Sequence, residues 1–129
     1  MHIFTLVTDV EKVVESLRKQ QGEFALALLY NETLDAGRGW NLIVAAPWAD
    51  KMGDADATRV IAHALHDGLA LENQPTISRV TVLKTSDPFV KDMIGLYPVT
   101  PGARVPVQQL TAGQLTEGSG FILYSQKVA

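Results

Sequence analysis

The chain has 129 residues, of which 47% are hydrophobic and 19% are charged, and its formal net charge is −3 at pH 7. This length and composition are typical of one folded globular domain, so we predict a single domain over residues 1–129. The eleven Lys and Arg residues are scattered, which argues against a nucleic-acid partner. The absence of cysteine excludes disulfides, thiolate catalysis and cysteine-based zinc sites, and fits a reducing compartment.

The first residues do not resemble a signal peptide. Residues 3–7 are mostly apolar, but no Lys or Arg precedes them and Asp9 and Glu11 follow at once. The longest apolar stretch is far below the roughly 20 residues that span a bilayer. We therefore expect a cytoplasmic protein with no membrane partner.

A first helix is predicted to begin at a capping box. The Thr8 hydroxyl and the Glu11 carboxylate have the spacing that satisfies free N–H groups at a helix start. Gly22 would end this helix, and residues 3–7 are expected to form a short strand before it. The helix would bury one apolar stripe, formed by Val10, Val13, Val14 and Leu17.

Two apolar runs, over residues 24–30 and 40–46, predict central strands. Neither run alternates with polar residues, which indicates strands covered on both faces. The link over residues 31–39, with Gly37 and Gly39, is too short for a crossover helix. The two strands should therefore be antiparallel neighbours.

A second helix is predicted over residues 54–67, with Asp54 or Asp56 as its cap and Gly68 at its end. A strand over residues 77–83 follows. Because the helix is long enough to bring the chain back across the sheet, this strand should run parallel to the second strand.

A third, shorter helix is predicted after Ser86. Ser86 is a good cap, Asp87 favours the positive end of a helix, and Pro88 suits the first turn. Gly95 and Pro98 would end it.

Residues 98–120 are rich in Pro and Gly and predict a long loop or a hairpin. The pentapeptide over residues 109–113 is echoed over residues 114–118. We expect the segment to form either a partner contact or lid, or an extra edge hairpin. A last strand is predicted over residues 121–124.

Together these elements predict an α+β (or α/β) sandwich. Its mixed sheet of four to five strands would be packed with three helices, in the order (β)-α-β-β-α-β-α-loop-β.

The segment Leu65-His66-Asp67-Gly68 resembles the metal-binding step of the HD phosphohydrolases, in which a His and the adjacent Asp hold divalent ions inside an all-helical bundle. The resemblance covers these four residues. That family also uses a His on a preceding helix and a distant Asp, whereas the only earlier His outside this helix is His2. The family is therefore not assigned.

His63 and His66 still have the spacing of metal ligands, and Asp67 could join them. Helical geometry nevertheless predicts that both imidazoles face solvent, and we predict no bound metal or cofactor. The buried face of this helix would instead be formed by Val60, Ile61, Ala64 and Gly68.

A candidate ligand site follows from the predicted topology. The carboxyl ends of the two parallel strands would bring the loops over residues 47–51 and 84–88 to one side of the sheet. Trp48 would supply an apolar wall, Lys84 a charge, and Asp50 or Asp87 a base or a cation ligand. The candidate residues are Trp48, Asp50, Lys84, Ser86 and Asp87. The alternative is that the same residues merely cap two helices.

No set of nucleophile, base and orienting residue can be named from the sequence. The preferred hypothesis is a non-catalytic protein-interaction or regulatory module that self-associates as a homodimer, through a possible exposed edge strand. A protein partner is a further possibility. The alternatives are a small-ligand-binding domain at the site just described and a metal-dependent hydrolase that uses His63, His66 and Asp67.

Overall fold

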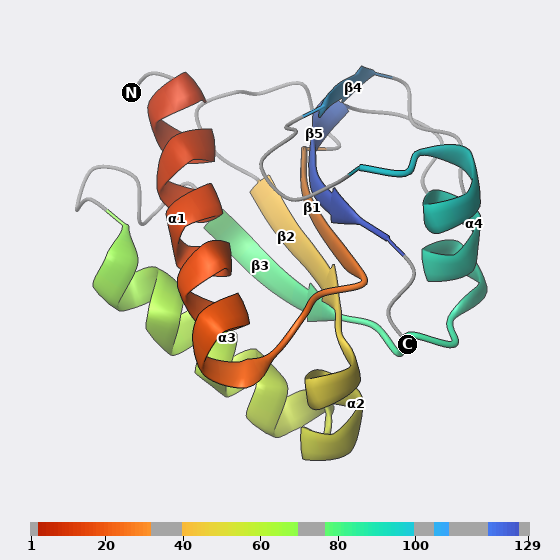
Figure 1. Ribbon diagram of the computed structural model, residues 1–129. Helices are drawn as coiled ribbons and strands as arrows, with labels where there is room; N and C mark the ends of the chain where they lie inside the picture. The colour runs from red at the N-terminus through yellow and green to blue at the C-terminus, as the bar shows by residue number, and fades with distance from the viewer. Residues whose placement is uncertain (1–2, 32–39, 70–76, 100–104, 109–118, 127–129) are drawn as a thin grey trace.

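The computed structural model describes residues 3–31, 40–69, 77–99, 105–108 and 119–126 (Figure 1). The helices are α1 (Ile3–Gln21), α2 (Pro47–Met52), α3 (Asp54–Gly68) and α4 (Pro88–Leu96). The strands are β1 (Leu26–Asn31), β2 (Trp40–Ala45), β3 (Ile77–Val82), β4 (Val105–Gln108) and β5 (Ser119–Ser125). These elements confirm the predicted α+β architecture. None of these helices is both long and apolar enough to cross a membrane.

The strands form one mixed sheet in the order β3-β2-β1-β5-β4. β1 and β2 are antiparallel and β2 and β3 are parallel, and both directions are as predicted. Part of the Pro/Gly-rich segment forms β4, which pairs with β5. The link over residues 32–39, and the pentapeptide echo at residues 109–118, lie outside the described residues.

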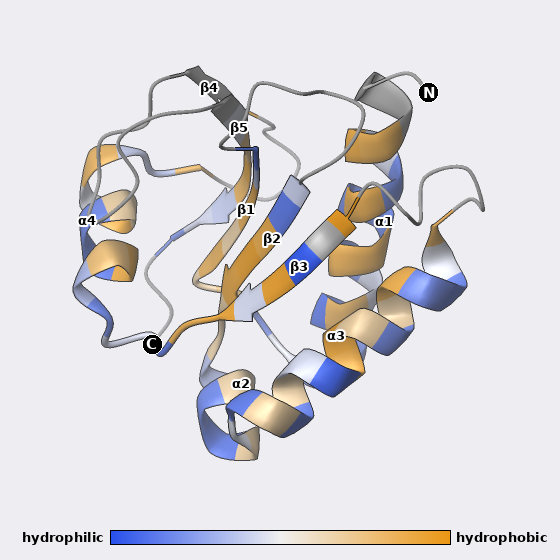
Figure 2. Ribbon diagram, turned by 180° about the vertical axis from the view of Figure 1, so that it is seen from behind, coloured by the Kyte–Doolittle hydropathy of each residue, from blue (hydrophilic) through white to orange (hydrophobic). Residues whose placement is uncertain are grey.

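Helices cover both faces of the sheet. α1 and α3 lie on one face and α4 lies on the other (Figure 1). β1 is buried along its whole length, and β2 is buried at every position except Asn41. This agrees with their scarcity of polar residues, whereas β3 contains both hydrophobic and polar residues (Figure 2).

α1 begins at Ile3, so the expected strand over residues 3–7 is wrong and the Thr8–Glu11 capping box does not start the helix. Leu6 and Val7 are fully buried and continue the apolar stripe toward the N-terminus. Burial of a longer amphipathic face therefore outweighs the local capping signal. Gly22, whose φ of 137° favours glycine, ends the helix with its N–H bonded to the carbonyl of Arg18.

Residues 47–52 form α2 where the sequence indicated a loop, so the described chain has four helices instead of three. Gly53 is the single residue between α2 and α3 and serves as the C-cap of one and the N-cap of the other. The prediction that Asp54 or Asp56 caps α3 is therefore wrong. Both carboxylates lie in its first turn, where they complement the helix dipole.

The N-cap of α4 is Asp87 instead of Ser86. Its carboxylate accepts a hydrogen bond from the N–H of Phe89 at 2.8 Å, and Pro88 follows in the first turn as predicted. The expected cap was displaced by one residue because both side chains have capping ability and Pro88 sets where the helix begins.

Candidate functional site

The structure brings together the two loops of the sequence-predicted ligand site. The Asp50 carboxylate, on α2, accepts hydrogen bonds from the backbone N–H of Thr85, at 3.2 Å, and from the Thr85 hydroxyl. These contacts join the segments that follow β2 and β3. The Asp50 carboxylate thus links the two loops through hydrogen bonds.

Asp87 and Lys84 also bond within the chain, whereas the Nε1 atom of Trp48 is buried without a hydrogen-bond partner among the described residues. Asp87 caps α4, and the Nζ atom of Lys84 lies 3.5 Å from the Oδ1 atom of Asp54. The Trp48 ring packs edge-on against Phe24, with ring centroids 5.6 Å apart. Among these candidates, Ser86 is exposed. These contacts connect α2 and α3 to the segment after β3 and stabilise the start of α4.

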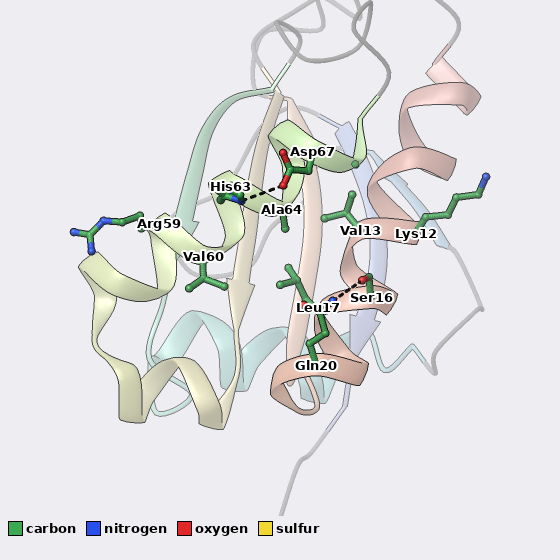
Figure 3. A pocket seen from close by; sticks show the side chains of 11 residues that line it. Lys12, Val13, Ser16, Leu17, Gln20, Arg59, Val60, His63, Ala64 and Asp67 are labelled. Carbon is green, nitrogen blue, oxygen red and sulfur yellow. Dashed lines mark hydrogen bonds and ion pairs between the residues drawn. The ribbon is translucent and has the colours of Figure 1, made fainter.

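The histidines and Asp67 of the proposed metal site are divided between two sides of α3. The Nδ1 atom of His63 lies 3.2 Å from the Oδ2 atom of Asp67, and these side chains are 76% and 63% exposed (Figure 3). His66 instead lines the side of α3 that faces β3. In the segments that the structure describes, no three His, Cys, Asp or Glu side chains are grouped so as to hold a metal ion.

An open groove of about 570 Å³ separates α1 from α3 (Figure 3). Its floor is apolar and is formed by Val13, Leu17, Val60 and Ala64. The charged side chains of Lys12 and Arg59 point away from this floor in Figure 3. Arg59 is also paired with Asp56 at 2.9 Å, so its charge is already balanced on the same helix.

A second hollow, of about 290 Å³, lies on the other side of α3 beside β3. Its lining is formed by Thr58, Ala62, Leu65, His66, Leu69, Ile77, Arg79 and Val80. β3 is the last strand of the sheet on this side. The hollow therefore combines apolar side chains, the polar side chains of Thr58, His66 and Arg79, and an edge strand of the described sheet.

The backbone of β3 presents hydrogen-bonding groups to this edge. The N–H of Leu83 donates to the carbonyl of Val44 at 2.9 Å, so Leu83 points its backbone toward β2. Successive residues of a strand point their backbone groups to opposite sides. Arg79 and Thr81 therefore pair with β2, and the N–H and C=O groups of Val80 and Val82 point outward. The pairing register with β2 shifts between Ile77 and Arg79, so this alternation does not extend to Ser78.

A polar network that the sequence did not reveal joins α1 to β5. The Tyr124 hydroxyl donates a hydrogen bond to Glu15, and Arg18 bonds both Glu15 and Glu23. The Arg18 hydrogen bonds, followed by that of Tyr124, lower the pKa of Glu15 to about 2. Burial, followed by the bond to Glu15, raises the pKa of Tyr124 to about 12. The Glu15–Arg18 spacing was readable in the sequence, whereas Tyr124 is 109 residues away.

Three surfaces thus differ in what they offer. In the loops after β2 and β3, Asp50, Lys84 and Asp87 bond within the chain. The groove between α1 and α3 has an apolar floor with outward-pointing charges. The β3 side alone among these three offers a strand edge.

Comparisons with protein-family models, with curated proteins and with solved structures find no match to this chain.

Proposed function

We propose that this protein is a non-catalytic interaction module that self-associates as a homodimer through its β3 edge surface. This surface consists of the outward backbone groups of Val80 and Val82 together with the hollow between β3 and α3. The observation that carries the proposal is that an edge strand with outward donors and acceptors borders a hollow whose lining is mainly apolar and also includes Thr58, His66 and Arg79.

Edge strands are templates for pairing because their outward N–H and C=O groups are satisfied by a second strand. Ile77, Val80 and Val82 are only half-buried, so a neighbouring chain would cover apolar surface that still contacts water. Ala62 is exposed on α3 at the same hollow, and its small side chain permits close approach of another helix. A second copy that extends the sheet would both pair the outward backbone groups and cover the exposed apolar surface.

The observations give less support to the two alternatives. A small-ligand site would need Asp50 and Asp87, but Thr85 and the α4 backbone already engage these carboxylates. A metal-dependent hydrolase would need His63, His66 and Asp67 to converge, but His66 lines a different hollow from the other two. Homodimerisation uses groups that face outward.

Sedimentation equilibrium or light scattering at micromolar concentration tests the proposal directly. The expected mass is twice the 14.0 kDa of one chain. A mass of 14.0 kDa at every concentration would overturn the proposal.

Ala62→Arg tests the surface itself. The substitution places a long charged side chain in the proposed interface, at an exposed position where the monomer tolerates it. We expect this variant to be monomeric. Gln20→Arg is the matched control, because Gln20 is an exposed residue of α1 that lines the groove on the other side of α3. If both variants form dimers of equal affinity, the β3 edge surface is not the dimer interface.

A further inference from the structure

We infer that the hollow between α3 and β3 binds a small aliphatic carboxylate, with the carboxylate at Arg79 and the aliphatic chain against the apolar side chains between the helix and the strand. The hollow has a volume of about 290 Å³. This volume is near the lower end of the range for clefts that hold small molecules. Such a ligand would occupy part of the surface that the proposed homodimer covers.

The lining of the hollow is apolar along most of its length and cationic toward one end. β2 and β3 are parallel and α3 connects them, so α3 and β3 run in opposite directions (Figure 2). The last turn of α3 therefore lies beside the first residues of β3. His66 belongs to that last turn, Arg79 is the third residue of β3, and both line the hollow. None of the described residues in this lining is Asp or Glu.

The charge of Arg79 has no ion-pair partner in the part of the chain that the structure describes. Arg18 is paired with Glu15, and Arg59 is paired with Asp56. No described carboxylate is paired with Arg79 in this way. A guanidinium presents parallel N–H groups that match the two oxygens of a carboxylate. A ligand with a carboxylate head therefore complements this end of the hollow.

The apolar part of the hollow suits an aliphatic tail. Leu65 and Leu69 line it and are buried, whereas Ile77 and Val80 are only half-buried. A hydrocarbon chain on these side chains would remove apolar surface from water on both sides of the contact. The lining follows α3 from Thr58 to His66, a length of about 12 Å at the rise of an α-helix. This elongated lining favours an extended chain.

Titrations with hexanoate, 1-hexanol and acetate test the site, with the NMR signals of the side-chain methyl groups as the readout. Hexanoate has both head and tail, 1-hexanol has the tail without the charge, and acetate has the head without the tail. Hexanoate should shift the methyl signals of Leu65, Leu69, Ile77 and Val80 and bind about fivefold more tightly than 1-hexanol. Acetate at the same concentrations should leave these signals unchanged.

Arg79→Gln separates the charge from the apolar lining. This variant should bind hexanoate about fivefold more weakly than the wild type and should bind 1-hexanol equally well. Unchanged binding of 1-hexanol would also show that the hollow keeps its shape. Arg59→Gln is the matched control, because Arg59 lines the groove on the other side of α3. The control should bind hexanoate as the wild type does.

Three results would overturn the carboxylate site. The first is that none of the four methyl signals shifts with hexanoate in excess, and the second is that hexanoate and 1-hexanol bind equally well. The third is an equal loss of hexanoate binding in Arg79→Gln and Arg59→Gln.

Sedimentation distinguishes this site from the proposed homodimer. Because the ligand and the second copy use the same hollow, hexanoate in excess should shift the mass of the wild type toward the 14.0 kDa of one chain. A mass of 14.0 kDa without hexanoate would overturn the homodimer and leave the ligand site standing. A dimer that hexanoate neither binds nor dissociates would overturn the ligand site and leave the homodimer standing.

Discussion

The two edges of the sheet differ in what they can offer another strand. β3 has six residues without a proline, and Val80 and Val82 point backbone donors outward. β4 has four residues and includes Pro106, which has no N–H to donate. Short strands and prolines are common devices that prevent edge-to-edge pairing. The two edges therefore differ in the backbone donors that they present, and we expect this difference to decide which of them pairs with another strand.

The two sides of the sheet are also held by different means. The β5 side depends on a close approach at Gly120, where an added Cβ would overlap the carbonyl oxygen of Leu29, and on the hydrogen bond from Tyr124 to Glu15. The β3 side is held by α3 and by the Asp50–Thr85 contact. Substitutions on the β5 side should therefore alter folding, and those at the outer edge of β3 should alter association.

Gly120→Ala should have the largest effect. Its methyl group would collide with the β1 backbone and separate β1 from β5, at a cost of about 3 kcal/mol in the free energy of unfolding measured with urea. Gly95→Ala is the control, because nothing lies within 4 Å of its added Cβ on α4. This control should be stabilised by up to about 1 kcal/mol. Equal urea midpoints for both variants would contradict the close packing of β5 on β1.

Val80→Pro should weaken dimerisation while the monomer stays folded. Proline removes the outward N–H of Val80, so each copy loses a donor at the proposed interface and the dissociation constant rises about tenfold or more, as measured by sedimentation. In Thr81→Pro the lost N–H is one that pairs with β2, so urea unfolding should instead show a loss of at least about 1 kcal/mol. If Val80→Pro dimerises as the wild type does, the β3 edge is not the dimer interface.

Glu15→Gln should make stability less sensitive to acid. The folded-state pKa of Glu15, about 2, lies below its ordinary value of 4.5, so the ionised carboxylate stabilises the fold above pH 4.5 and this contribution is lost as pH falls toward 2. The effect is at most about 1 kcal/mol, because the side chain is 37% exposed and solvent screens the charge. Urea unfolding at several pH values measures it. Parallel curves for Glu15→Gln and the wild type between pH 4.5 and 2 would contradict the Tyr124–Glu15–Arg18 network.

His63→Ala should have the smallest effect, within about 0.5 kcal/mol, because its ion pair with Asp67 is mostly exposed. Added Zn²⁺ or Mn²⁺ should leave the Tm of the wild type unchanged. A rise in Tm that His63→Ala abolishes would support the metal-site alternative over the edge-surface proposal.

Local patterns in the sequence were sufficient for the central part of this fold. The unbroken apolar runs in β1 and β2 predicted strands buried on both faces, because a strand with one solvated face alternates. The short link between them required antiparallel pairing, and the helix after β2 allowed the parallel return of β3. The outward position of His63 and His66 followed from helical periodicity.

Only the tertiary structure decided the features that depend on partners distant in the chain. α1 extends to Ile3 because Leu6 and Val7 find buried partners, and Tyr124 meets Glu15 only after the sheet has formed. The same holds for the candidate surfaces: the sequence suggested an exposed edge, and only the strand order places β3 and β4 at the two edges of the sheet. Local propensity is set by neighbours within a few residues, whereas burial and strand order depend on contacts between segments that the sequence keeps far apart.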